Sequence, residues 1–238
     1  MKTRIAIVVG VVSLLTGTAL GQGGQVRWPY PVPYATSAVT GRPYSAEEVA
    51  ERKQTLSDGT QISHPTSTIK IFRDSAGRTR TERVFHVEIH DVVAGYRYIL
   101  DTVNKVAHRS AVVPRPAVAE VARPGAPKAV DGPPSFSHEP LDTQVMQGLT
   151  CVGSRFKMTY PVGAQGNDRP IIVTVDSWTS TEPRLMVLSK HTDPRMGVRI
   201  VQLKNISRAE PEYSLFQPPP DYKVVDETES FEIVIKFP

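Results

Sequence analysis

Apolar and polar residues alternate with a period of two along much of this 238-residue chain. The clearest case lies between Arg78 and His90, where Phe85, Val87 and Ile89 would share one face of a strand. Because successive side chains of a strand point to opposite faces, this alternation predicts a sheet with one apolar and one wet face. No long stretch carries the 3.6-residue period of an amphipathic helix. The core must therefore be built from strands.

Turn signals separate the expected strands. Leu56-Ser-Asp-Gly-Thr60 predicts a hairpin turn between strands over residues 49–56 and 60–64, although Ser45 to Glu48 also has the form of a helix capping box. Asp74 to Gly77 predicts the next turn. Further strands are expected around 96–100, 106–109, 143–146, 150–160, 171–178, 185–190, 198–207 and 231–237. The pattern predicts an all-β fold with minor helix: a curved antiparallel sheet or half-barrel of about ten strands.

The N-terminus has the form of a secretory signal peptide. Basic Lys2 and Arg4 precede an apolar run from Ile5 to Leu15, and Ala19-Leu-Gly21 provides small residues for cleavage. The apolar run is shorter than the ~20 residues of a membrane-spanning helix. These features predict a signal peptide over 1–21, cleavage after Gly21, no transmembrane segment in the mature chain, and a periplasmic or secreted location.

Two segments interrupt the strand pattern. Residues 22–44 are rich in glycine and proline and predict an extended or disordered arm, with Trp28 and Tyr30 able to dock on the body. Residues 111–140 hold seven prolines, a density that a central strand does not tolerate. We interpret this second segment as a Pro-rich insertion, either a flexible linker or a lid, within one β domain over 45–238.

Charge and cysteine content narrow the partners. The formal net charge is +4, and loss of Lys2 and Arg4 with the signal peptide leaves about +2, so no nucleic-acid partner is expected. The single cysteine, Cys151, excludes an intramolecular disulfide. Between Thr150 and Val152 it is more typical of a small buried hydrophobe than of a reactive thiol.

Two polar clusters are candidate sites. His86-x-Glu88-x-His90 resembles a metal-ligand string, but on one strand the two histidines lie ~13 Å apart and cannot share an ion, so a solvated face is favoured and neither a metal nor another cofactor is predicted. Four arginines crowd one hairpin and could bind an anionic head group or simply balance nearby carboxylates: Arg73, Arg78, Arg80 and Arg83. No nucleophile elbow, phosphate loop or zinc-protease motif is present, and no enzyme is predicted.

The C-terminal phrase Ser214-Leu-Phe-Gln-Pro-Pro-Pro220 followed by Val224 resembles the ending of bacterial proteins of the outer-membrane lipoprotein-sorting superfamily. The hairpin from Phe72 to Arg80, and Trp178 followed by a return strand, are similar to other segments of that superfamily. The stretch from Pro43 to Asp226 is more closely similar to uncharacterised exported bacterial proteins. The resemblance implies a periplasmic half-barrel whose concave face holds an acyl chain or an apolar partner.

Three hypotheses follow for function. The first is a non-enzymatic exported binding protein that holds lipid, lipoprotein or another apolar ligand. Its candidate ligand-binding residues are Phe85, Val87, Ile89, Tyr96, Tyr98, Arg78 and Arg80, although the apolar ones could equally fill a core. The second is an envelope sensor or scaffold that binds a protein partner. The third, and least favoured, is a metal-dependent hydrolase that uses His86, Glu88 or His90.

Overall fold

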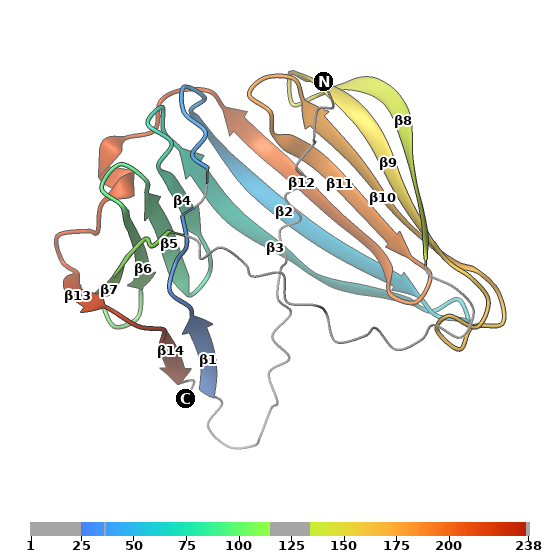
Figure 1. The fold of residues 1–238 in the computed structure, drawn as a ribbon, viewed down its shortest axis with the longest axis horizontal. Helices are drawn as coiled ribbons and strands as arrows, with labels where there is room; N and C mark the ends of the chain where they lie inside the picture. The colour runs from blue at the N-terminus through green and yellow to red at the C-terminus, as the bar shows by residue number, and fades with distance from the viewer. Residues whose placement is uncertain (1–24, 36, 115–133, 237–238) are drawn as a thin grey trace. The chain divides into compact units, whose positions relative to one another are not determined.

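The computed structural model describes residues 25–35, 37–114 and 134–236 (Figure 1). The expected signal peptide over 1–21 and most of the expected Pro-rich insertion lie outside these ranges. Most of the described residues lie in strands, and their one helical element is a 3-10 turn, so the predicted all-β class is confirmed. No helix in the described ranges is long and apolar enough to cross a membrane.

The described residues divide into two compact units, one from residues 25–31 and 230–236 and the other from the described residues between 32 and 229. The described part of the first unit is a two-stranded antiparallel sheet of β1 (Gln25–Tyr30) and β14 (Phe231–Lys236). Trp28 pairs with Ile233, and the rings of Tyr30 and Phe231 stack with centroids 5.2 Å apart. β1 lies within the segment 22–44 for which the sequence predicts an extended or disordered arm, and Val26, Trp28 and Tyr30 alternate along it.

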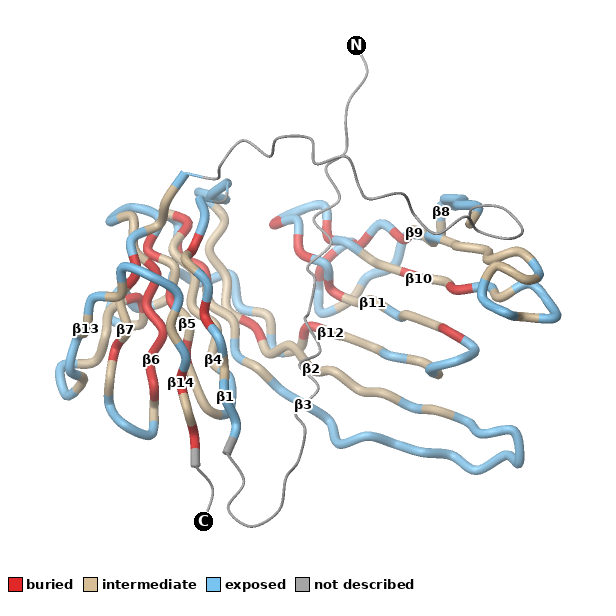
Figure 2. Tube along the Cα trace, turned by 60° about the horizontal axis from the view of Figure 1, so that its bottom comes forward, coloured by how far each residue is buried: buried red, intermediate tan, exposed pale blue. Residues whose placement is uncertain are grey.

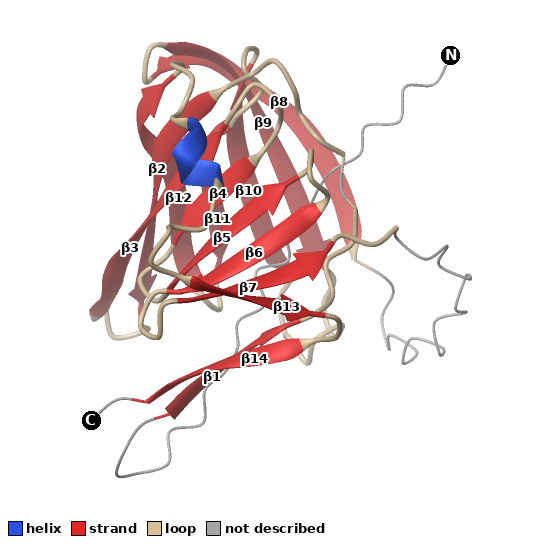
Figure 3. Cartoon of the chain, turned by 90° about the vertical axis from the view of Figure 1, so that its left-hand side faces the viewer, coloured by secondary structure: helices blue, strands red, loops and turns tan. Residues whose placement is uncertain are grey.

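The second unit is built on one open sheet of 12 strands, which curves strongly (Figures 1 and 3). Its spatial order is β13-β7-β6-β5-β4-β3-β2-β12-β11-β10-β9-β8. The strands are β2 (Tyr44–Thr55), β3 (Gln61–Arg73), β4 (Thr79–Glu82), β5 (His86–Asp91), β6 (Tyr96–Asp101), β7 (Val106–Ala111), β8 (Ser135–Met146), β9 (Leu149–Tyr160), β10 (Ile171–Ser180), β11 (Met186–Asp193), β12 (Gly197–Ser207) and β13 (Lys223–Glu227). Most neighbours are antiparallel hairpin partners, as the turn signals predict.

Three details differ from the sequence prediction. The stretch from Arg78 to His90 is two strands, β4 and β5, with a turn at Arg83. β13 pairs with β7 in parallel, so the sheet is mixed rather than purely antiparallel. β8 begins at Ser135 and runs through Pro140, which was assigned to the Pro-rich insertion. A proline fits there because β8 is an edge strand and does not need every backbone N–H for pairing.

Buried apolar residues form two separate core clusters. Figure 2 colours the buried positions red along the backbone. The first cluster joins β2, β9, β11 and β12: Ala46, Leu149, Cys151, Leu185, Val187 and Leu203. The second lies on β5 to β7 and is completed by Phe216 of a single 3-10 turn, η1 (Tyr213–Phe216), which contacts β4 and β5 (Figure 3). By contrast, β3 is exposed from Gln61 to Thr68.

Candidate functional site

The apolar residues proposed from the sequence as ligand contacts lie in the second core cluster. Val87, Ile89 and Tyr98 are 7%, 0% and 8% exposed, and they pack with Phe216. Tyr96 packs against the edge of the same cluster, and Phe85 is half-buried in the turn before β5. Val87, Ile89, Tyr96 and Tyr98 are packed with Phe216 of η1 and its neighbour Leu215, so they present no open apolar face.

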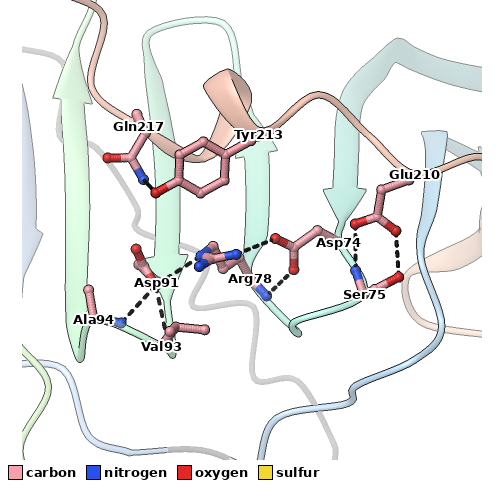
Figure 4. A network of polar contacts seen from close by, with 9 residues as sticks. All are labelled: Asp74, Ser75, Arg78, Asp91, Val93, Ala94, Glu210, Tyr213 and Gln217. Atoms are coloured by element: carbon pink, nitrogen blue, oxygen red, sulfur yellow. Dashed lines mark hydrogen bonds and ion pairs between the residues drawn. The ribbon is translucent and has the colours of Figure 1, made fainter.

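Arg78 and Arg80 also have structural partners. The Arg78 guanidinium contacts Asp74 at 2.9 Å and Asp91 at 3.2 Å, and it stacks on the Tyr213 ring (Figure 4). The hydrogen bonds to Asp74 raise the pKa of Arg78 above its usual value. Arg80 binds Glu82 at 2.7 Å and donates to the backbone oxygen of Leu215 at 2.8 Å.

These arginines join two segments that the resemblance had singled out separately. The hairpin that ends at Arg80 holds the Leu215-Phe216 phrase, because Arg80 binds its backbone and Phe216 inserts between the strands' apolar side chains. On the same side, Ser75 donates from its backbone N–H to Glu210 at 2.9 Å (Figure 4). A pocket of about 470 Å³ lies between the hairpin turn and the segment just before Leu215, and it is lined by residues of 74–78 and 210–213.

The polar string of β5 forms no metal site. His90 binds Glu88 through its Nε2 at 2.9 Å, and Glu88 also faces Arg83 at 3.7 Å. Burial opposes ionisation of Glu88, but the hydrogen bond from His90 and the nearby cations bring its pKa below the usual value. Within the described ranges, no three His, Cys, Asp or Glu side chains come together to hold a metal ion.

Cys151 has the buried place that its sequence context predicts. Its side chain lies in the first core cluster with no exposed area, and the thiol contacts the backbone oxygen of Leu149 at 3.4 Å. Burial raises the pKa of this thiol. A buried protonated thiol is a poor nucleophile, so Cys151 contributes to packing.

An exposed group of apolar side chains lies on one face of the sheet near its β8 edge. We call it the apolar band, and it consists of Phe136, Val145, Val152, Phe156 and Met186, which are 61%, 74%, 51%, 38% and 54% exposed. The register places them on a common face, because Val152, Thr179 and Met186 are direct neighbours across β9, β10 and β11. The rings of Phe136 and Phe156 stack with centroids 5.6 Å apart.

The opposite face of the same strands carries the first core cluster near Cys151 and a row of charged side chains further along β9. Arg155 on β9 binds Asp176 on β10 at 2.6 Å, and Lys190 on β11 is the next residue in that row. The hydrogen bond from Arg155 holds the pKa of Asp176 below its usual range. On that opposite face Leu149 and Cys151 are buried and Arg155 is paired with Asp176, whereas the side chains of the apolar band are exposed. Exposed apolar side chains gathered on one face are typical of a binding surface.

The strand beside the apolar band is an edge. β8 pairs with β9 on one side, and within the described residues its other side has no strand partner. Nearly all of β8 is exposed. An edge strand offers a row of backbone N–H and C=O groups to any extended segment that can align with it.

Sequence reasoning missed the apolar band. Phe136 falls in the stretch that its prolines assigned to an insertion, and the alternation of Phe136, His138 and Pro140 is weak. Val152 and Phe156 alternate clearly within 150–160, but alternation alone does not tell a covered face from an uncovered one.

Comparisons with known proteins give no family. No protein-family model matches the chain, and no curated protein matches it. Among solved structures it is similar to an uncharacterized conserved protein from Thermus thermophilus, at 9% identity and a TM-score of 0.42 over 78% of this chain and 91% of that one.

It is also similar to MucB, crystallised in complex with MucA(peri), at 12% identity and a TM-score of 0.38 over 77% of this chain and 57% of that one. Both are weak likenesses of fold. The resemblance to the lipoprotein-sorting superfamily stays a prediction.

Proposed function

We propose that this chain is a non-enzymatic exported binding protein that holds an extended, apolar segment of a partner protein along β8. The observation that carries the proposal is the apolar band beside an edge strand without a strand partner in the described ranges. The export part of the proposal rests on the N-terminal sequence.

The chemistry of the band favours a polypeptide strand as ligand. A strand added to β8 would bind through its backbone, and its alternate side chains would lie beside Phe136, whose ring stacks on Phe156. An acyl chain would gain from burial of apolar surface alone and would leave the backbone groups of β8 unused. The residues first considered for acyl binding, Val87, Ile89 and Tyr98, are already packed.

Site-specific photo-crosslinking tests this proposal. We would place a benzophenone amino acid at position 136 and irradiate the cells that make the protein. The control position is Ile172, which is 46% exposed and lies on the opposite face of β10, away from the β8 edge. We expect a discrete polypeptide adduct from position 136 and none from position 172, identified by mass spectrometry.

A substitution in the apolar band tests whether its side chains contribute to the affinity for the partner segment. Phe156→Ser should reduce the yield of the adduct at position 136 about tenfold, because truncation of a central aromatic contact costs roughly 1–3 kcal/mol of binding. The circular dichroism spectrum should be unchanged, since Phe156 is exposed. A lipid adduct at position 136 would contradict the proposal of a protein partner and would indicate an acyl ligand. Equal yields of adduct at positions 136 and 172 would show that the apolar band is not a specific binding site.

A further inference from the structure

A row of polar side chains crosses the second unit at the other end of the sheet. The register aligns one residue from each neighbouring strand on a common face: Tyr44, Arg73, Thr79, His90, Arg97 and Ser110. Two of these are arginines that are 9% and 6% exposed. Buried cations normally have an anionic partner, because removal from water without one is costly.

Arg73 has no such partner among the described residues. Its Nε donates to the backbone oxygen of Arg42 at 2.9 Å, and its guanidinium lies 4.7 Å from the centre of the Tyr44 ring. One terminal nitrogen, Nη2, is buried and has no hydrogen-bond partner in the described residues. Burial lowers the pKa of Arg73, and the positive charge of Arg42 acts in the same direction.

Arg73 lines a pocket of about 280 Å³, together with Thr79, His90 and residues 37–39. Thr79 lies directly between the other two, since it pairs with Arg73 on one side and with His90 on the other. Residues 37–39 form the opposite wall and are exposed, so the pocket is open to solvent. Gly77 allows residues 37–39 to lie close to the hairpin that follows Arg73, because a Cβ on Gly77 would be only 3.3 Å from the Cβ of Ala38.

No carboxylate lines this pocket, and two carboxylates in the strands and turn around it have partners of their own. Glu88 accepts from His90 and faces Arg83, and it lies one row further along the sheet. Asp74, the residue after Arg73, binds Arg78. The polar side chains that line the pocket are therefore the Arg73 guanidinium, the His90 imidazole and the hydroxyls of Ser37 and Thr79.

We propose that this pocket binds a small oxyanion, a carboxylate or a phosphate, through Arg73, with Thr79 and His90 completing the site. A guanidinium matches the geometry of two oxygens of such an anion, and a buried one gains most from the contact. The site is separate from the apolar band and does not depend on the function proposed for it.

Thermal unfolding of the full mature chain in inorganic phosphate tests the proposal, because a ligand of the native state raises the unfolding midpoint saturably. Ionic strength is held constant with chloride. We expect phosphate to raise the midpoint of thermal unfolding saturably, and by more than chloride does at the same ionic strength. Arg73→Gln should weaken the apparent affinity about tenfold or more, since a hydrogen bond to a charged group contributes roughly 1.5–3 kcal/mol. Acetate in place of phosphate shows which class of oxyanion the pocket prefers.

Arg155→Gln is the matched control, because Arg155 is an arginine of the same sheet that binds Asp176 outside the pocket. It should keep the response to phosphate. An unchanged response in Arg73→Gln, or equal effects of phosphate and chloride on the wild type, would overturn the proposal.

A second pair of variants covers the case in which Arg73→Gln does not fold. Thr79→Glu places a carboxylate between Arg73 and His90, so it should raise the midpoint in chloride and abolish the response to phosphate. Thr81→Glu, two residues along the same strand, faces Glu88 and should lower the midpoint while keeping the response. A normal phosphate response in Thr79→Glu would exclude Arg73 as the anion ligand.

Discussion

At the scale of single residues, buried aspartates close several turns of the sheet. Asp91, Asp101 and Asp193 end their strands and are only 4%, 4% and 3% exposed. Each carboxylate accepts hydrogen bonds from backbone N–H groups two or three residues later, as Asp101 does from Val103 and Asn104 at 3.0 Å. These contacts satisfy turn N–H groups that have no strand partner.

Asp193 shows how such a carboxylate links stability to pH. Hydrogen bonds from Arg195 hold its pKa below the usual value of 3.8. The unfolded chain therefore binds a proton first as the pH falls, so the stabilisation is present above about pH 4 and is lost below it. We expect Asp193→Asn to lower the free energy of unfolding by about 1 kcal/mol at pH 7, and by less at pH 3.

Urea unfolding of both proteins at pH 7 and pH 3 measures this difference. A gap between wild type and variant that is as large at pH 3 as at pH 7 would mean that the charge of Asp193 does not stabilise the turn.

Gly59 and Gly197 have similar backbone conformations but different surroundings, so alanine variants of the two distinguish the cost of backbone strain from the cost of a steric clash. Gly197 and Gly59 have φ values of +87° and +85°. A Cβ on Gly197 would clash with the backbone oxygen of Lys53, whereas one on Gly59 would meet nothing within 4 Å. Gly59→Ala should cost about 1 kcal/mol from conformation alone. Gly197→Ala should cost clearly more, since the β2 backbone must also move. Denaturant midpoints of the two variants give the comparison, and equal losses would contradict it.

At the scale of elements, η1 acts as the cover of the second core cluster. Phe216 has no exposed area, whereas Tyr213 in the same turn is 59% exposed. Phe216→Ala should lower the free energy of unfolding by about 3–5 kcal/mol, because it leaves a cavity over Ile89 and Leu100. Tyr213→Ala should cost less than about 1 kcal/mol. Guanidinium unfolding tests both, and similar losses for the two would show that η1 does not depend on Phe216.

The hairpins were predictable from the sequence because their signals are local. Asp58 and Gly59 mark one turn, and the alternation of Tyr96, Tyr98 and Leu100 marks a strand of the next hairpin. β13 was not predictable, because its partner β7 lies more than a hundred residues earlier and pairs in parallel. The first part of β8 was not predicted as a strand because it contains Pro140. A strand tolerates proline at the edge of a sheet, and the sequence alone does not show which strand lies at the edge.

Candidate site residues were harder to predict than strands. The sequence placed Val87 and Ile89 on one face correctly, but whether that face is open depends on Phe216, more than 120 residues away. The group of hairpin arginines was also identified, yet Arg78 and Arg80 have carboxylate partners and Arg73 has none among the described residues. Whether an apolar side chain is exposed and whether an arginine has a carboxylate partner depend on contacts between segments that are distant in the sequence. The local residue pattern does not reveal these contacts.

At the scale of the whole sheet, the two edges differ in how they resist pairing with other chains. β13 is short and carries Lys223, Asp226 and Glu227, whereas β8 is long and its main interruption is Pro140. Pro140→Val restores a backbone N–H and raises β propensity, so we expect increased self-association in sedimentation velocity. Pro140→Lys restores the N–H but adds a charge, and it should stay closer to the wild type. No change in Pro140→Val would show that the β8 edge is blocked by something other than this proline.

The pairing of β1 with β14 has a mechanical consequence. Gln25 and Lys236 face each other at one end of this small sheet, so its first and last residues lie side by side. A force that pulls these two residues apart acts across the ladder and breaks its hydrogen bonds one pair at a time. The two-stranded sheet should therefore open first and at low force, like a zipper, in a single-molecule stretching trace.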